Sequence, residues 1–89
     1  MRRITIGELD TIMRACAVGA EGTPGIEQAP DRPFGDLGYD SLALLETCSR
    51  IERDFDVVFS EDGLGGITTA RELVELVNWL LQLKEERAA

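Results

Sequence analysis

The sequence predicts a small all-α protein built from three principal helices. Apolar residues recur every three or four positions in three segments, about residues 6–18, 41–55 and 69–87, which is typical of amphipathic helices. The 22 residues from 19 to 40 hold all three prolines and five of the nine glycines, which favours a long irregular loop after the first helix. The 89 residues suffice for one domain, expected over residues 1–89 with an ordered core at about 5–83.

The first helix is expected from Ile6 to about Val18. Thr5 and Glu8 fit a capping box at its start, and Gly19 and Gly22 favour its end. Its predicted buried stripe consists of Leu9, Ile12, Met13 and Cys16. No regular element is expected in the loop that follows, although its apolar residues Ile26, Phe34 and Leu37 should attach it to the core.

The second helix is expected from Ser41 to Asp54 or Phe55, with Asp40 or Ser41 as its cap. The predicted inward stripe is Leu42, Leu45, Cys48, Ile51 and Phe55. Residues 56–59 are expected to form a buried connection rather than a strand, because no partner strand is expected. Residues 60–66 contain three glycines and are expected to form one helical turn at most.

The last helix begins with a second capping box, Thr69 and Glu72. Its inward stripe is predicted to be Leu73, Leu76, Val77, Leu80, Leu81 and Leu83, with Val74 and Trp79 beside it. The sequence therefore predicts three principal helices, with a short additional one between the last two.

Composition excludes several classes of function. The 17 acidic residues outnumber the nine basic ones, and this net charge of −8 argues against nucleic-acid binding. Because the chain has no histidine, it cannot form a Ser-His or Cys-His catalytic pair. Cys16 and Cys48 belong to no metal or disulfide motif and are expected to be buried free thiols. The absence of a signal peptide and of a membrane span indicates a cytoplasmic protein.

One segment carries chemistry: residues 36–46, which place Ser41 between the long loop and the second helix. A hydroxyl there lies at the positive end of a helix, where a phosphate group is stabilised. Asp40 is the only base beside it and a weak one, so modification by another enzyme is favoured over self-activation. The simpler interpretation is that Asp40 and Ser41 do nothing but cap the helix.

The longer string Gly-Tyr-Asp-Ser-Leu-Ala-Leu-Leu-Glu, residues 38–46, closely resembles the phosphopantetheine attachment site of acyl carrier proteins. It is most similar to carriers of bacterial aromatic (type II) polyketide synthases. Phe34 and Asp36 fit the loop of that family, and residues 69–78 resemble its last helix. Ala70 and Ser60 stand where relatives often have proline.

The resemblance implies an acyl-carrier-like four-helix bundle whose third helix is short. A phosphopantetheinyl transferase would move 4′-phosphopantetheine from coenzyme A onto Ser41, with Gly38, Tyr39, Asp40 and Leu42 as the surrounding motif. The arm would carry starter, extender and growing chains as thioesters. The carrier, itself non-catalytic and monomeric, would present them to a ketosynthase/chain-length factor, a malonyl acyltransferase, and a ketoreductase, aromatase or cyclase.

The helix after the serine is the usual docking surface of such carriers. Leu45, Glu46 and Glu52 are therefore the expected docking residues, inside an acidic stretch from Asp36 to Asp62 with eight acids and two bases. Arg71 at the mouth of the last helix is expected to be a surface residue.

Two alternatives remain open at this point. The first is a carrier of another pathway, either fatty acid or peptide synthesis. Peptide carriers tend to have glycine where this chain has Tyr39, and fatty-acid carriers tend to have a more acidic second helix. The second is a small helical interaction module in which Ser41 stays unmodified; a phosphopantetheinylation assay separates it from both kinds of carrier.

Overall fold

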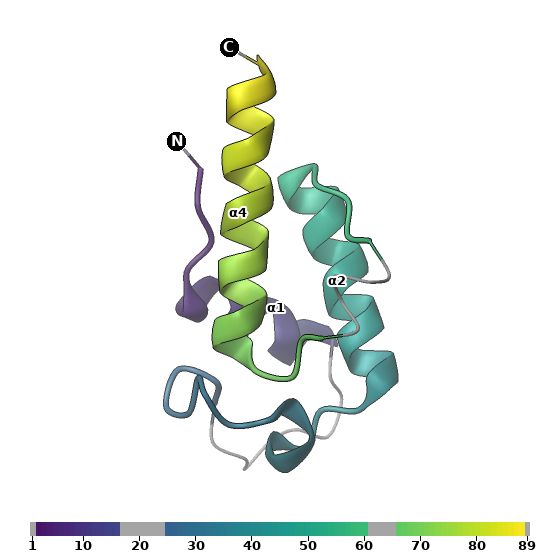
Figure 1. The fold of residues 1–89 in the computed structure, drawn as a ribbon. Helices are drawn as coiled ribbons and strands as arrows, with labels where there is room; N and C mark the ends of the chain where they lie inside the picture. The colour runs from purple at the N-terminus through teal and green to yellow at the C-terminus, as the bar shows by residue number, and fades with distance from the viewer. Residues whose placement is uncertain (1, 17–24, 61–65, 89) are drawn as a thin grey trace.

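Three α-helices and one short 3₁₀-helix form the described part of the protein. A computed structural model describes residues 2–16, 25–60 and 66–88. The helices are α1 (Ile6–Cys16), η1 (Phe34–Leu37), α2 (Ser41–Phe55) and α4 (Ala70–Ala88). Helices α2 and α4 both start at the end of the molecule where η1 lies, and α1 crosses behind them and contacts both (Figure 1). The predicted all-α fold is confirmed.

Both predicted capping boxes are present. The Glu8 amide donates to Thr5 Oγ1 at 3.1 Å, and Glu72 donates to Thr69 Oγ1 at 3.2 Å. At α4 the box is fully reciprocal, because the Thr69 amide also donates to the Glu72 carboxylate at 3.0 Å. These contacts explain why α1 and α4 begin where the sequence predicts.

The core fills the space between the three α-helices. Its largest fully buried side chains are Leu9, Met13, Ile26, Leu37, Thr47, Ile51, Leu73 and Val77. Phe34 is buried as well, so Ile26, Phe34 and Leu37 attach the loop to the core as predicted. Leu76, Leu80 and Leu83 are only half-buried, and Trp79 is 57 % exposed on the outer face of α4.

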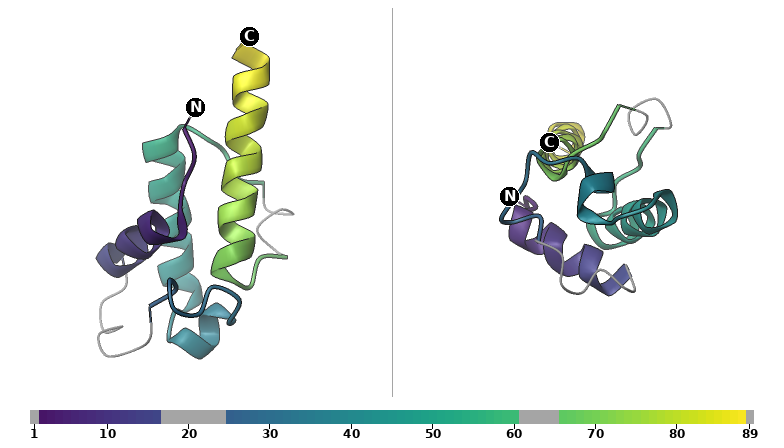
Figure 2. Two further views of the ribbon diagram at one scale, coloured as in Figure 1. Left: turned by 90° about the vertical axis from the view of Figure 1, so that its left-hand side faces the viewer. Right: turned by 90° about the horizontal axis from the view of Figure 1, so that it is seen from below.

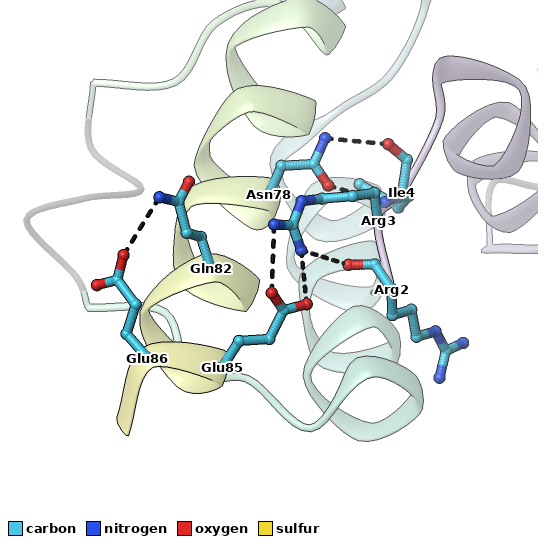
Figure 3. Close-up of polar contacts among 7 residues, drawn as sticks. All are labelled: Arg2, Arg3, Ile4, Asn78, Gln82, Glu85 and Glu86. Carbon is cyan, nitrogen blue, oxygen red and sulfur yellow. Dashed lines mark hydrogen bonds and ion pairs between the residues drawn. The ribbon is translucent and has the colours of Figure 1, made fainter. Parts of the chain in front are cut away.

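The N-terminal residues 2–5 run alongside α4 (Figures 1 and 2). Asn78 of α4 accepts a hydrogen bond from the Ile4 amide at 2.8 Å and donates one to the Ile4 carbonyl at 3.1 Å (Figure 3). Arg3 pairs with Glu85 at 2.9 Å, about two turns further along α4. The Asn78 side chain thus pairs both backbone groups of Ile4, as a neighbouring β-strand would do.

Five expectations are corrected or lie outside the described residues. The prediction of no regular element between residues 19 and 40 is wrong, because Phe34–Leu37 forms a 3₁₀-helix and Pro33 makes an isolated bridge with Thr69. Cys16, expected to be buried, is half-buried. Of the predicted buried connection, Val57 is buried whereas Val58 is 79 % exposed. The end of the first helix beyond Cys16 and most of the expected short third helix lie outside the described residues.

The predicted inward stripe of α2 is wrong at its first two positions. Leu42 and Leu45 are 64 % and 60 % exposed. The buried residues of α2 are Ala43, Thr47, Cys48, Ile51 and Phe55. Thr47 is tolerated in the core because its hydroxyl donates to the Ala43 carbonyl at 2.8 Å. None of the described helices is both long and apolar enough to cross a membrane.

Candidate functional site

Asp40 and Ser41 have separate roles at the start of α2. Asp40 is the cap: its backbone is extended, with φ −92° and ψ 177°, and its carboxylate accepts the Ala43 amide at 2.8 Å. Ser41 is the first helical residue and is exposed. The cap therefore does not use the serine hydroxyl, which remains open to another molecule.

The surroundings of Ser41 favour a phosphate group more than nucleophilic catalysis. The amides of Ser41 and Leu42 precede the first hydrogen bonds of α2, which are made by Ala43 and Leu44 to Asp40. These amides and the helix dipole stabilise negative charge at this end. Since the Asp40 carboxylate is engaged by the Ala43 amide, the described site holds no strong base for the hydroxyl.

The residues before the serine form a fixed turn. Gly38 has φ 87° and ψ 9°, a left-handed conformation that suits glycine, and it ends η1. Its neighbour Tyr39 donates its amide to the Phe34 carbonyl at 3.1 Å and packs edge-on against the Phe34 ring at 6.3 Å. Burial raises the pKa of Tyr39, and the Asp10 carboxylate raises it further, while Arg14 opposes this shift. Tyr39 thus anchors the motif to α1.

An apolar pocket of about 230 Å³ opens beside the serine. Its walls are Phe34, Ser41, Leu44, Leu45, Cys48, Ile67 and Leu73. Three separate segments contribute: η1, α2, and residues 67–73 at the start of α4. The pocket has the chemistry to shelter an apolar part of a group attached at Ser41.

Backbone and side-chain contacts hold the walls of this pocket together. The Phe34 amide donates to the Thr68 carbonyl at 2.8 Å. Arg71 donates its amide to the Pro30 carbonyl at 3.0 Å and pairs with Asp31 at 2.6 Å. Arg71 is exposed, as predicted, but it also ties the loop to α4. Spacing within the sequence gives no indication of this contact between distant segments.

Comparison with known proteins identifies the family. The model of the phosphopantetheine attachment site matches residues 12–77. The chain is 42 % identical over 78 residues to the oxytetracycline polyketide synthase acyl carrier protein of Streptomyces rimosus, covering 88 % of this chain and 82 % of the relative. The chain belongs to the acyl carrier proteins. It is therefore a non-catalytic carrier, and its cofactor is phosphopantetheine.

Further relatives and solved structures agree. The actinorhodin polyketide synthase acyl carrier protein of Streptomyces coelicolor is 38 % identical, with 88 % of this chain and 91 % of the relative aligned. The solution structure of the oxytetracycline carrier has a TM-score of 0.75 at 39 % identity, covering 92 % of this chain and 86 % of that one. The octanoyl form of the actinorhodin carrier gives 0.83 at 36 % identity, covering 91 % and 94 %. The resemblance to carriers of type II polyketide synthases is confirmed.

The three docking residues expected for this carrier all lie on α2. Leu45 and the exposed Glu46 lie on the outer face of α2, one turn beyond Ser41. Glu52 is half-buried, and its carboxylate accepts the Phe59 amide at 2.9 Å. Glu52 lies two turns beyond Leu45 and fixes the segment after α2, and its part in docking stays a prediction.

The acidic stretch around the serine is less uniform than the sequence suggests. Asp54 contacts Arg50 and Arg53, and Asp56 pairs with Lys84 at 2.8 Å. Asp36 and Glu46 are exposed and take part in none of the described ion pairs. Glu61 and Asp62 lie outside the described residues. Among the described residues, the negative charge available to a partner near Ser41 thus comes from Asp36, Asp40 and Glu46.

Proposed function

We propose that Ser41 is the attachment residue for 4′-phosphopantetheine and that the loaded arm carries polyketide chains. The observation that supports this most strongly is the exposed hydroxyl of Ser41 at the start of α2, freed from capping by Asp40. The arm's terminal thiol would supply the thioester chemistry. The protein would hold the arm, position it beside the apolar pocket, and present it to enzymes.

Attachment needs a partner enzyme. The Ser41 oxygen would form a bond to phosphorus, the pyrophosphate bond of coenzyme A would break, and adenosine 3′,5′-bisphosphate would leave. The hydroxyl proton would pass to a base of the phosphopantetheinyl transferase, because the Asp40 carboxylate is engaged and the sequence has no histidine. The carrier's own contribution is the exposed hydroxyl and the positive helix end that favours the new phosphodiester.

Polyketide synthesis is the pathway that the relatives favour. The similar curated proteins include carriers of oxytetracycline, granaticin and actinorhodin synthases. The corresponding partners would be a ketosynthase/chain-length factor, a malonyl acyltransferase, and a ketoreductase, aromatase or cyclase. The cytoplasmic location stays a prediction.

The partners would dock through Leu45 and Glu46. Both side chains are exposed and lie about one turn from Ser41. A basic residue near the partner's active-site entrance would be attracted to Glu46, which mainly raises the association rate. Glu46→Lys should leave thermal stability nearly unchanged and lower kcat/KM for loading and chain transfer. Added salt should narrow the difference in kcat/KM between the variant and wild type. Equal kcat/KM values at low salt would contradict the docking role of Glu46.

Intact-mass spectrometry tests the attachment itself. The protein is incubated with coenzyme A, magnesium and a broad-specificity phosphopantetheinyl transferase. Wild type should gain one arm and Ser41→Ala none. Ser49→Ala is the matched control, since Ser49 is also an exposed serine of α2, and it should gain one arm. An arm on Ser41→Ala, or none on wild type, would refute the proposal.

A further inference from the structure

The outer strip of α2 comprises the residues on the face opposite the core. With about 100° between successive residues, six side chains fall on this one side of the helix. They are Leu42, Leu45, Glu46, Ser49, Arg50 and Arg53. The last five line a shallow surface groove of about 370 Å³. Five of these six residues are exposed and Arg50 is half-buried, so a partner can reach the strip.

The chemistry of the outer strip changes in order along the helix axis. Leu42 and Leu45 form an apolar end nearest Ser41, and Glu46 follows them. Arg50 and Arg53 lie about 14 Å and 18 Å from Ser41 at 1.5 Å per residue. The strip therefore has an acidic position near the attachment site and a basic end far from it.

The basic end holds more positive charge than its neighbours neutralise. Arg50 and Arg53 share the single carboxylate of Asp54, at 3.5 Å and 3.4 Å. Arg2 adds a third guanidinium: it donates to the Asp54 carbonyl at 3.0 Å and lies over the Phe55 ring at 4.0 Å. Two guanidinium groups thus share one carboxylate, and a third lies against the backbone of the same residue.

This arrangement differs from the other ion pairs of the described residues. Those pairs each match one cation with one carboxylate: Arg3 with Glu85, Arg14 with Asp10, Arg71 with Asp31, and Lys84 with Asp56. In a chain of net charge −8, an excess of arginine on an exposed face runs against the overall balance. An acidic group from outside would compensate this excess at little desolvation cost, because the Arg53 side chain is 75 % exposed.

We propose that Arg50 and Arg53 bind acidic side chains of the synthase enzyme that docks on α2. This inference rests on the proposed carrier function and extends it. A matching partner would have a basic residue near its active-site entrance, opposite Glu46. It would have an acidic residue about 10 Å further along, opposite the basic end. Docking in the reverse direction would bring like charges together. The acidic position and the basic end together therefore orient the carrier so that Ser41 faces the partner's active-site entrance.

The test uses carriers that already bear the arm and charge reversals at the basic end. The variants are Arg50→Glu, Arg53→Glu and the double variant. Arg32→Glu, an exposed loop arginine away from α2, is the control with the same change in net charge as each single variant. The measured quantities are KM and kcat for chain extension by a purified ketosynthase/chain-length factor of a type II polyketide synthase that accepts the wild-type carrier.

We expect the double variant to raise KM about tenfold at low salt with kcat nearly unchanged, and Arg53→Lys to behave like wild type. Arg32→Glu should stay within about twofold of wild type. The difference in KM between the double variant and wild type should shrink as salt is added. KM values for Arg53→Glu and the double variant equal to that of Arg32→Glu would overturn the inference. Intact masses taken beforehand separate this inference from the proposed carrier function. A wild type without an arm refutes the carrier function, whereas variants that bear the arm and have the same KM as the control refute only partner binding by Arg50 and Arg53.

Discussion

At the scale of single residues, the site depends on a division of labour between two neighbours. Asp40 supplies the cap, worth about 1 kcal/mol, through its bond from the Ala43 amide. Ser41 is thereby left with an exposed hydroxyl. The sequence alone left open which of the two residues caps α2, because both types are favoured there. The extended backbone of Asp40 and the contact of its side chain decide the question.

The two cysteines are predicted to react differently. Burial, and secondarily the charge of Glu52, raises the pKa of Cys48 to about 11, so at pH 8 only about one thiol in a thousand is ionised. Cys16 is half-buried at the end of the described part of α1. A thiol reagent followed by peptide mapping should label Cys16 first and Cys48 only after unfolding. Equal labelling rates in the folded protein would contradict the buried position of Cys48.

At the scale of elements, the positions of the helices along the chain could be predicted, but the buried face of α2 could not. The predicted stripe of α2 advanced in steps of three residues from Leu42 to Ile51. Each step of three falls about 60° short of a full turn, so after three steps the two residues point to opposite sides. Leu42 is accordingly exposed and Ile51 fully buried. The core instead contains Ala43 and Thr47, which are small or polar and therefore do not stand out in the apolar pattern.

The attachment motif was predictable because its residues are contiguous. The pocket beside it was not, because Phe34, Cys48, Ile67 and Leu73 come from distant parts of the chain. Only the tertiary contacts from Phe34 to Thr68 and from Arg71 to Asp31 bring these walls together. The 3₁₀-helix was missed since a single turn needs no periodic pattern, only the turn-forming Pro33 and Gly38 at its ends.

The N-terminal segment gives a prediction for α4. Asn78→Ala should remove both bonds to Ile4 and leave its backbone groups unpaired, at a cost of about 1–3 kcal/mol in the free energy of unfolding. Gln82→Ala, which removes only a surface contact with Glu86, is the matched control. Urea unfolding measures the stability, and hydrogen exchange of the Ile4 amide measures the local opening. Equal stability of the two variants would show that residues 2–5 contribute little.

At the scale of the whole molecule, carboxylates that hold segments together make stability depend on pH. Hydrogen bonds from Thr68 and Thr69 lower the pKa of Glu72 from its ordinary value of 4.5. Lys84 lowers the pKa of Asp56, and Arg3 lowers that of Glu85. A carboxyl group with a lower pKa in the folded state stabilises the fold above its unfolded pKa, and this stabilisation is lost as the pH falls through the folded value.

Glu72→Gln should therefore melt below wild type at pH 7, and the difference should narrow as the pH falls below about 4.5. Circular dichroism melts at pH 7, 5 and 3.5 provide the measurement. Glu75→Gln, at an exposed position of the same helix, is the control and should show a small difference that varies less with pH. A gap between wild type and Glu72→Gln that stays constant over this range would argue against the role of the Glu72 carboxylate.

The central claim is that this protein carries acyl groups on an arm attached to Ser41. Its most direct test is the intact mass after the armed protein meets malonyl-coenzyme A and a purified malonyl acyltransferase. Wild type bearing the arm should gain one malonyl group that neutral hydroxylamine removes, as it does from a thioester. Wild type without the arm and Ser41→Ala should gain none. A malonyl group on Ser41→Ala, or none on the armed wild type, would contradict the account.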